Sequence, residues 1–234
     1  MKKIKLEDVA LRIRDKIINT GYRLGVGHIG SCLSCVEIMV YLYYYRMKPN
    51  DIFILSKGHA SLVQYCILND LGIIPDELLW DYPSKLGIHP ELDKSLGIYA
   101  STGSLGHGIG IGLGYAVGNK DISVYVLLGD GETDEGSVYE ALSIKESLGV
   151  NNLIPIIDRN GFKGYDAIRM RAGLLDGHSF DEIDYGFDNK SSYPILEFKT
   201  IKGKGLERFE DDLGSHYWFI NEKDINEYKK DLYR

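Results

Sequence analysis

The chain contains 234 residues, of which 44% are hydrophobic and 26% charged, so its composition excludes a disordered, collagen-like or low-complexity protein. Its formal net charge of −7, from 27 basic and 34 acidic residues, argues against a non-specific nucleic-acid binder. No apolar run approaches the length of a membrane span, and the start lacks the apolar core of a secretory signal. We therefore expect neither a nucleic-acid nor a membrane partner.

The cysteines indicate a reducing compartment. They number three, which is odd and too few for a disulfide framework: Cys32, Cys35 and Cys66. Cys32 and Cys35 have the spacing of a redox motif, but the other features of a thioredoxin site are missing. We interpret all three as buried free thiols and expect a cytoplasmic protein.

The first 102 residues combine helices, one strand and long loops. Apolar residues at intervals of four, three and four, from Leu6 to Ile17, predict an amphipathic helix. Ser34 and Glu37 have the spacing of a capping box, which predicts that a second helix begins there. The other predicted elements are a glycine-rich loop over 21–30, a strand over Ile52–Leu55, a loop over Ser56–Ala60, an apolar helix to about Leu71 and a long loop over 72–102.

Glycines recur between apolar residues over 106–118. Gly106, Gly110, Gly114 and Gly118 are four apart. Because glycine costs a helix about 1 kcal/mol per position relative to alanine, such a run needs a close approach to the backbone. The intervening side chains are too apolar for a flexible loop. We predict a buried helix pressed against a neighbouring strand, helix or subunit.

The second half shows the pattern of a strand, a helix and another strand. Apolar runs over Val124–Leu128 and Leu153–Ile157 enclose a helical stretch from about Gly136 to Leu148. This pattern predicts a parallel sheet buried on both faces. A further strand is predicted over Ile195–Lys199 and a polar helix over Lys223–Leu232. With no repeat and no evident linker, we expect one α/β domain, a parallel sheet flanked by helices.

Both strands of this unit lead into loops with oxygen-bearing side chains. Asp130 follows the first strand, between Gly129 and Gly131, and Asn160 follows the second. Ligands gather at the carboxyl ends of parallel strands, and hard oxygen donors suit Mg²⁺ or Ca²⁺ better than zinc. We predict that a divalent cation holds a diphosphate at this edge of the sheet, which would also overcome the unfavourable net charge.

The histidines indicate a polar pocket. The chain has six, four of which directly follow a glycine: His28, His59, His89, His107, His178 and His216. Several stand at predicted strand ends or helix starts, a placement that suits a hydroxylated or phosphorylated ligand. The alternative is zinc, but no histidine pair has the i, i+4 spacing of a helical zinc site, and no cysteine pairs with a histidine at finger spacing.

Several short blocks stand in a defined order along the chain. They are Gly27–Gly30, Leu55–His59, His89–Glu91, Ser101–Gly106, the Gly129–Gly131 loop together with Asn160, and Lys199–Gly205. Each block alone has low specificity, but together the blocks closely resemble the amino-terminal, thiamin diphosphate-binding domain of the transketolase family. The resemblance runs from about residue 10 to 216, and we expect residues 1–234 to form one such domain.

The resemblance implies how the cofactor is held. Asp130, Asn160 and the backbone carbonyl of Phe162 would bind Mg²⁺ on the diphosphate of thiamin diphosphate. His59 would contact that diphosphate. The other cofactor contacts that the resemblance implies are Gly103, Ser104, Leu105, Gly129, Gly131 and Glu135.

The resemblance also implies a catalytic set. His28, His89 and His216 would surround the reacting carbons, hydrogen-bond sugar hydroxyls and assist proton transfer. Glu135 and Glu140 match carboxylates that join a network across a subunit interface in the family, although a solvated helix face would explain them equally well. The aromatic surroundings of His216 make its match the loosest of the set.

The implied reaction is transfer of a two-carbon ketol unit from a ketose or ketose phosphate to an aldose, with chemistry supplied mainly by the cofactor. Family enzymes are far longer and carry a pyrimidine-binding and a carboxyl-terminal domain, and nothing after Gly205 is long enough for either. We therefore predict a split transketolase, in which a separate C-terminal subunit completes a heterotetramer. The glycine-rich helix would allow self-association.

Two other functions remain open at this point. A subunit of another thiamin diphosphate enzyme, such as a 2-oxoacid dehydrogenase or a decarboxylase, shares the Gly-Asp-Gly…Asn pattern but would not be expected to show the blocks of His28, His59 and His89 together. A non-catalytic cofactor-binding partner would have no use for a hydroxyl-binding pocket. One departure is a segment between Gly164 and His178 that is shorter than the family pattern.

Overall fold

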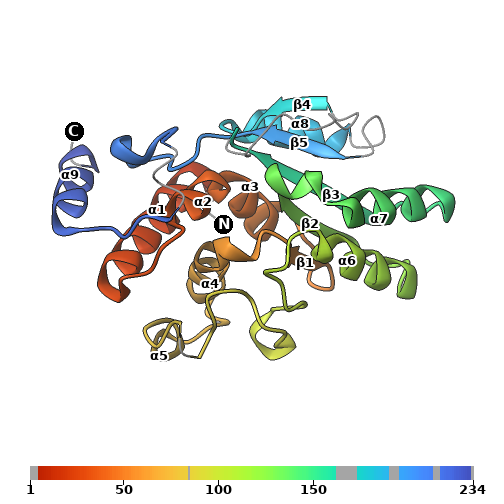
Figure 1. Cartoon of the computed structure of the whole chain (residues 1–234), viewed down its shortest axis with the longest axis horizontal. Helices are drawn as coiled ribbons and strands as arrows, with labels where there is room; N and C mark the ends of the chain where they lie inside the picture. Colours follow the sequence, from red (N-terminus) through yellow and green to blue (C-terminus); the bar gives the residue numbers. More distant parts are fainter. Residues whose placement is uncertain (1–4, 84, 162–172, 190–194, 213–216, 233–234) are drawn as a thin grey trace.

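A parallel sheet forms the centre of the molecule (Figure 1). The structure, a computed structural model, describes residues 5–83, 85–161, 173–189, 195–212 and 217–232. Within these ranges the sheet has five strands in the order β1-β2-β3-β5-β4, and every neighbouring pair is parallel. The strands are β1 (Ile52–Leu55), β2 (Val124–Gly129), β3 (Leu153–Arg159), β4 (Gly173–Asp176) and β5 (Leu196–Lys199). The predicted parallel sheet is confirmed.

Helices cover both faces of this sheet. The helices of the described residues are α1 (Leu6–Leu24), α2 (Ile29–Ser34), α3 (Val36–Tyr41), α4 (Ser61–Asp70), α5 (Asp76–Leu79), α6 (His107–Gly118), α7 (Gly136–Ser147), α8 (Phe180–Asp188) and α9 (Glu222–Leu232). Of these, α5 and α9 lie farther from the sheet, where α5 packs on α4 and α9 on α1. Strand residues alternate between two cores, as the pleat requires. Phe53 and Leu55 join the core with α1–α4 and α8, whereas Ile52 and Ile54 join the core with α6 and α7 (Figure 1).

A helix does begin within the predicted capping box, at Val36, but the cap itself and the predicted loop are wrong. α3 has no side-chain cap, because the Ser34 hydroxyl donates to Asp158 (2.6 Å) and Glu37 binds cations instead. The predicted loop over 21–30 is much shorter, since α1 continues to Leu24 and α2 begins at Ile29. Long-range polar contacts thus take the groups that local capping would have used.

The glycine-rich segment forms α6, as predicted, but only one side of it is buried. A Cβ on Gly112 would meet Val126 Cγ2 at 2.5 Å, so glycine there lets the helix lie directly on β2. Gly110, Gly114 and Gly118 have nothing within 4 Å of such an added carbon. The close approach to a strand is therefore confirmed on one side, and the other side faces solvent.

Some short elements were not predicted. The segment 72–102, expected to be a loop, contains α5 and a 3-10 turn over Lys94–Leu96. β4 and α8 also lie in a part of the chain where the sequence indicated no element. α5, β4 and the 3-10 turn are too short to show an apolar period, whereas α8 begins with a local signal that was overlooked, the capping spacing of Ser179 and Glu182.

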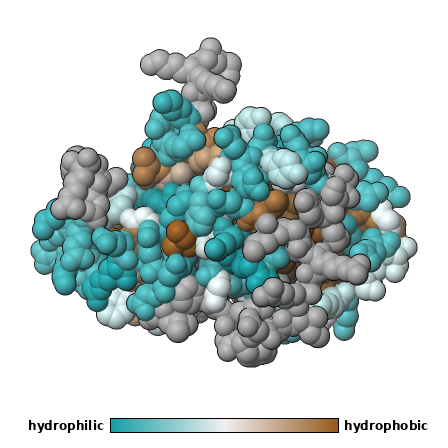
Figure 2. Space-filling view, turned by 90° about the horizontal axis from the view of Figure 1, so that it is seen from above, coloured by the Kyte–Doolittle hydropathy of each residue, from teal (hydrophilic) through white to brown (hydrophobic). Residues whose placement is uncertain are grey.

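The surface is largely hydrophilic in the view of Figure 2, with apolar residues in small patches. No helix within the described residues is long and apolar enough to cross a membrane.

Candidate functional site

Two of the three predicted metal ligands, Asp130 and Asn160, lie at the carboxyl edge of the sheet. β2 and β3 pair so that Gly129 lies opposite Asp158, which places Asp130 and Asn160 on adjacent strand ends. The Asp130 carboxylate is almost fully buried and accepts hydrogen bonds from Gly131 N (2.9 Å) and Gly161 N (2.7 Å). One carboxylate therefore joins both loops.

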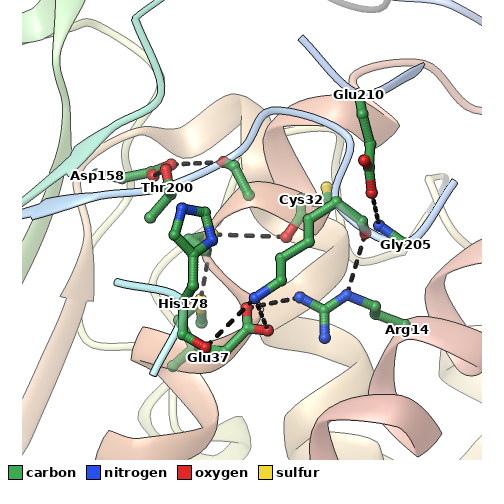
Figure 3. A network of polar contacts seen from close by, with 12 residues as sticks. Arg14, Cys32, Glu37, Asp158, His178, Thr200, Gly205 and Glu210 are labelled. Carbon is green, nitrogen blue, oxygen red and sulfur yellow. Dashed lines mark hydrogen bonds and ion pairs between the residues drawn. The ribbon is translucent and has the colours of Figure 1, made fainter. Parts of the chain in front are cut away.

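A buried ion pair that the sequence analysis did not predict lies beneath these loops. Asp158 and Lys57 are buried and paired, and the Lys57 ammonium also donates to Ser31 O (3.0 Å). Asp158 further accepts hydrogen bonds from the hydroxyls of Ser34 and Thr200, the latter seen in Figure 3. Such a pair is tolerated only when its partners satisfy it, so this network holds the ends of β1, β3 and β5 to α2.

Lys202 brings a second buried ammonium to the same place. Burial and the neighbouring Lys57 lower the pKa of Lys202 to about 8, although Asp130 and Asp158 act in the opposite direction. Burial and Asp158 raise the pKa of Asp130. These shifts show that two carboxylates and two ammonium groups interact in one partly desolvated place.

The loop that carries Lys202 is anchored to the first helices (Figure 3). The buried Glu37 carboxylate pairs with Arg14 (2.6 Å) and with the Lys204 ammonium (2.7 Å). Arg14 Nε also donates to the Lys204 carbonyl (3.0 Å), and Gly203 N donates to Gly30 O (3.0 Å). These contacts hold Gly203 and Lys204, the two residues that directly follow Lys202. They therefore also determine where Lys202 lies.

Three of the predicted histidines approach the same edge. The ring centroids of His28 and His59 lie 5.4 Å apart, and His28 has the left-handed backbone conformation (φ 60°) that favours glycine. The His89 ring packs on Gly103, where an added Cβ would lie 2.9 Å from His89 Cγ. A Cβ on Gly58, next to His59, would lie 2.7 Å from Gly103 N. The histidine loops therefore converge on the loop that carries Gly103.

Other predicted cofactor residues lie around the place where the histidine loops meet the loop of Gly103. Ser104 and Leu105 are exposed at its rim, and Glu135 is exposed beside Gly106, where an added Cβ would lie 2.7 Å from Glu135 Cβ. Glu140 is exposed on α7, and together with residues of α6 it lines an open hollow of about 450 Å³. Phe162 and His216 lie outside the described residues.

The aromatic residue after His216 does contact the site. Tyr217 packs its ring edge-on against His28, with centroids 4.8 Å apart. It also lies above Gly27, where an added Cβ would approach the Tyr217 ring to 3.3 Å. The sequence analysis noted this aromatic neighbourhood without giving it a role.

The sequence analysis assigned no role to Lys57, Asp158 or Lys202. Both lysines stand directly before a glycine in a block that carried the resemblance, and Asp158 ends the apolar run of β3. A charged residue at the end of a buried strand is a usable signal. Nothing local indicated that these three residues would be buried together.

The donor set fits a diphosphate held through a divalent cation. The charges of Asp130 and Asp158 balance those of Lys57 and Lys202, so an anionic group would need a further cation. Among the described residues, no three His, Cys, Asp or Glu side chains cluster as a protein-only metal site requires. Two side-chain oxygen donors are too few for a complete magnesium shell, and Mg²⁺ in proteins is commonly bound by one or two such ligands together with phosphate oxygens.

The comparisons with known proteins give the family. The chain matches the family described as "Transketolase, thiamine diphosphate binding domain" over residues 8–168. It is 34% identical to a transketolase of Pongo abelii over 90% of its own length, but it spans only 39% of that relative.

Two relatives of similar length are subunits. A protein of Phocaeicola vulgatus, named as one subunit of an apulose-4-phosphate transketolase, is 33% identical, with 84% of this chain and 83% of the relative covered. "6-deoxy-6-sulfo-D-fructose transketolase subunit SqwG" of Clostridium sp. (strain MSTE9) is 30% identical, with 95% of this chain and 94% of the relative covered.

The fold agrees with these relatives. Superposition on the crystal structure of transketolase from Campylobacter jejuni gives a TM-score of 0.80 at 27% identity, covering 97% of this chain and 42% of the other. The family match, the relatives and the superposed fold together show that the chain belongs to the transketolase family, of which it carries the thiamin diphosphate-binding domain.

Proposed function

We propose that this chain is the N-terminal subunit of a two-polypeptide transketolase, which transfers a two-carbon ketol unit from a ketose or ketose phosphate to an aldose. The observation that carries the proposal is the hydrogen bond from Gly161 N to Asp130 (2.7 Å), because it joins the two loops of the predicted metal site. Two relatives of similar length that are named as transketolase subunits support the two-polypeptide form.

Asp130, Asn160 and the carbonyl of Phe162 would hold Mg²⁺, or Ca²⁺ in its place. Burial of Asp130 suits this role, since its carboxylate is already oriented by two backbone N–H groups. His59 would donate to the diphosphate, and Gly103, Ser104 and Leu105 would border the pyrimidine. Glu135 and Glu140 would face a subunit interface.

Bound thiamin diphosphate supplies the nucleophilic carbon and the electron sink of the reaction. The chain's own residues bind and orient the sugar. His28, His89 and His216 would donate hydrogen bonds to sugar hydroxyls and hold or move a proton at the oxygen whose charge changes. The packing of His28 between the rings of His59 and Tyr217 restricts its orientation, which suits a residue that must present one nitrogen to substrate.

The partner would be a C-terminal subunit with the pyrimidine-binding and carboxyl-terminal domains, a proposal supported by the two relatives of similar length that are named as transketolase subunits. The outer side of α6 and α7 would be a self-association surface. It exposes four large apolar side chains around the open glycines of α6: Ile111, Val117, Ile144 and Leu148.

We also propose a cytoplasmic location. The three cysteines are buried free thiols, and burial raises the pKa of Cys32 to about 11. Protonated, enclosed thiols suit a reducing compartment in which no disulfide is needed.

The function is tested by ketol-transfer assays of the purified chain, alone and mixed with a candidate second subunit, in the presence of thiamin diphosphate and Mg²⁺. We expect consumption of a ketose phosphate only in the mixture, and no consumption of a 2-oxoacid. Full transfer activity of the chain alone would refute the split form. Consumption of a 2-oxoacid instead would assign another thiamin diphosphate reaction.

Histidine variants test the roles within that mixture. His28→Ala and His89→Ala should retain cofactor binding, measured by calorimetry, while turnover falls by about 10²–10⁴-fold, the usual contribution of proton transfer by a positioned side chain. Unchanged turnover in both variants would show that these histidines do not act on the substrate.

A further inference from the structure

Glu132 is a buried carboxylate to which the proposed reaction assigns no role. It lies in the 3-10 turn Gly131–Asp134, two residues after Asp130, and is 1% exposed. A carboxylate that is taken out of water needs hydrogen-bond donors at both oxygens, so its partners explain why it is there.

Three uncharged donors surround this carboxylate. Oε1 accepts hydrogen bonds from the Ser56 hydroxyl and from Gly106 N (2.7 Å), and Oε2 accepts one from Gly129 N (3.2 Å). Gly106 is the N-cap residue of α6, where the free N–H groups of the helix favour a negative charge.

The three donors belong to three different segments of the proposed cofactor site. Ser56 follows β1 and leads into His59. Gly106 directly follows the loop of Gly103, Ser104 and Leu105. Gly129 ends β2 and directly precedes the proposed metal ligand Asp130.

These segments are packed too closely to move independently. A Cβ added to Gly108 would lie 2.5 Å from Ser56 Cβ, and a Cβ added to Gly58 would lie 2.7 Å from Gly103 N. The Glu132 carboxylate is the acceptor that the three segments share, and each of its oxygens is in use. Its geometry therefore determines the spacing between the segments.

We propose that Glu132 is a positioning residue, which holds the three cofactor-binding segments at the spacing that thiamin diphosphate and its metal require without touching either. This inference rests on the proposed function for the identity of the cofactor. It assigns to Glu132 an effect on cofactor affinity, in addition to any effect on folding.

The test compares Glu132→Gln with a matched variant, Asp51→Asn. A glutamine keeps the shape but turns one acceptor into a donor, which would then face an N–H or O–H group. Like Glu132, Asp51 is a buried carboxylate with uncharged donors; within the described residues these are Lys48 N (2.9 Å) and Ser123 N (2.8 Å). Unlike Glu132, it lies at the amino edge of β1 and β2. Both variants turn one acceptor of a buried carboxylate into a donor, at opposite edges of the same sheet.

The measurements are the melting temperature of the cofactor-free full chain and the Kd of thiamin diphosphate with Mg²⁺ by calorimetry. We expect both variants to lower the melting temperature. Only Glu132→Gln should raise the Kd, by tenfold or more, while Asp51→Asn stays within about twofold of the original chain. In the assembled complex, saturating cofactor should restore most of kcat to Glu132→Gln, as expected for a residue that does not take part in the chemistry.

Equal Kd values for the original chain and Glu132→Gln would overturn the inference and leave the proposed function intact. No binding of thiamin diphosphate by the original chain, with or without the second subunit, would instead refute the proposed function. If Glu132→Gln does not fold, Ser56→Ala gives the same test with one donor removed. We then expect a Kd increase of about threefold to tenfold, and an unchanged Kd would count against the inference.

Discussion

The two faces of the sheet are covered in different ways. On the face of α1–α4, all six residues of α3 and eight of the ten residues of α4 are buried. On the other face, only Val138 and Ala141 of the twelve residues of α7 are buried, and α6 buries five of twelve. The first face is closed by the chain itself, whereas the second is half open.

From this difference we expect that substitutions on one face change the stability of the fold, whereas substitutions on the other face change its association with other chains. The closed face carries the network of Lys57, Asp158 and Thr200 and the anchor of the Lys202 loop, so changes there should act on folding. The open face carries apolar residues with little to pack on, so changes there should act on association. The predictions below test this division.

The largest effect is expected at Asp158. Asp158→Ala leaves the buried Lys57 ammonium without its carboxylate, which should lower the free energy of unfolding by about 3–5 kcal/mol in urea titrations. A double variant, Asp158→Ala with Lys57→Met, removes both charges and should recover part of the loss. A double variant no more stable than the single one would show that the unpaired charge is not the cause.

A smaller effect is expected from shortening one side chain on the closed face. Ile38 is fully buried in α3. Ile38→Val should lower the free energy of unfolding by about 0.5–1.5 kcal/mol, because it removes one packed methylene group and leaves a small cavity. Chemical denaturation measures this, and a loss below about 0.3 kcal/mol would mean that α3 can close the space.

The next effect depends on pH. Arg12 donates two hydrogen bonds to Asp70 (2.9 Å each), which with the Tyr44 hydroxyl hold the pKa of the Asp70 carboxyl below its ordinary value of 3.8. A lowered pKa adds stability above that value, and this contribution disappears as the pH falls through the pKa of the folded chain. Arg12 is half exposed, so Arg12→Met should cost only about 0.3–1 kcal/mol at pH 7.

Thermal melts of the original chain and Arg12→Met at a series of pH values test this sign. The difference in stability should be constant from pH 7 down to about pH 4 and should shrink below it. A difference that grows as the pH falls would exclude the ion pair between α1 and α4 as its source.

The smallest effect on folding is expected on the open face. Ile144 is about half exposed on α7 (48%). Ile144→Ser should change the free energy of unfolding of the isolated chain by no more than about 0.5 kcal/mol. It should nevertheless weaken self-association, measured by sedimentation, by at least tenfold. Unchanged association would show that the side of α6 and α7 is not the proposed surface.

Apolar periodicity predicted the elements that depend on local pattern. The runs at 52–55, 124–128 and 153–157 became β1, β2 and β3, and the glycine-rich run became α6. Where long-range contacts decide, the prediction was wrong: Ser34 was expected to cap α3, but it binds Asp158, 124 residues away. β4 carries too short a pattern to be predicted, but the start of α8 could have been found from the capping spacing of Ser179 and Glu182.

The site shows the same limit. That Asp130 and Asn160 would lie close followed from two parallel strands ending at one edge. The burial of Lys57 and Lys202 beside them did not follow, because the groups that face these lysines come from α2, the end of β3 and the loop after β2. Glu132 likewise gave no local signal, since two of its donors are 26 and 76 residues away and the third, Gly129 N, ends the preceding strand.

The anchor formed by Arg14, Glu37 and Lys204 has a consequence for synthesis on the ribosome. Arg14 and Lys204 are 190 residues apart. During synthesis Arg14 and Glu37 are both made well before Lys204, so the three-residue anchor cannot be complete until the chain has been made at least as far as Lys204. We therefore expect the loop of Lys202 to take its final position only after Lys204 has left the exit tunnel.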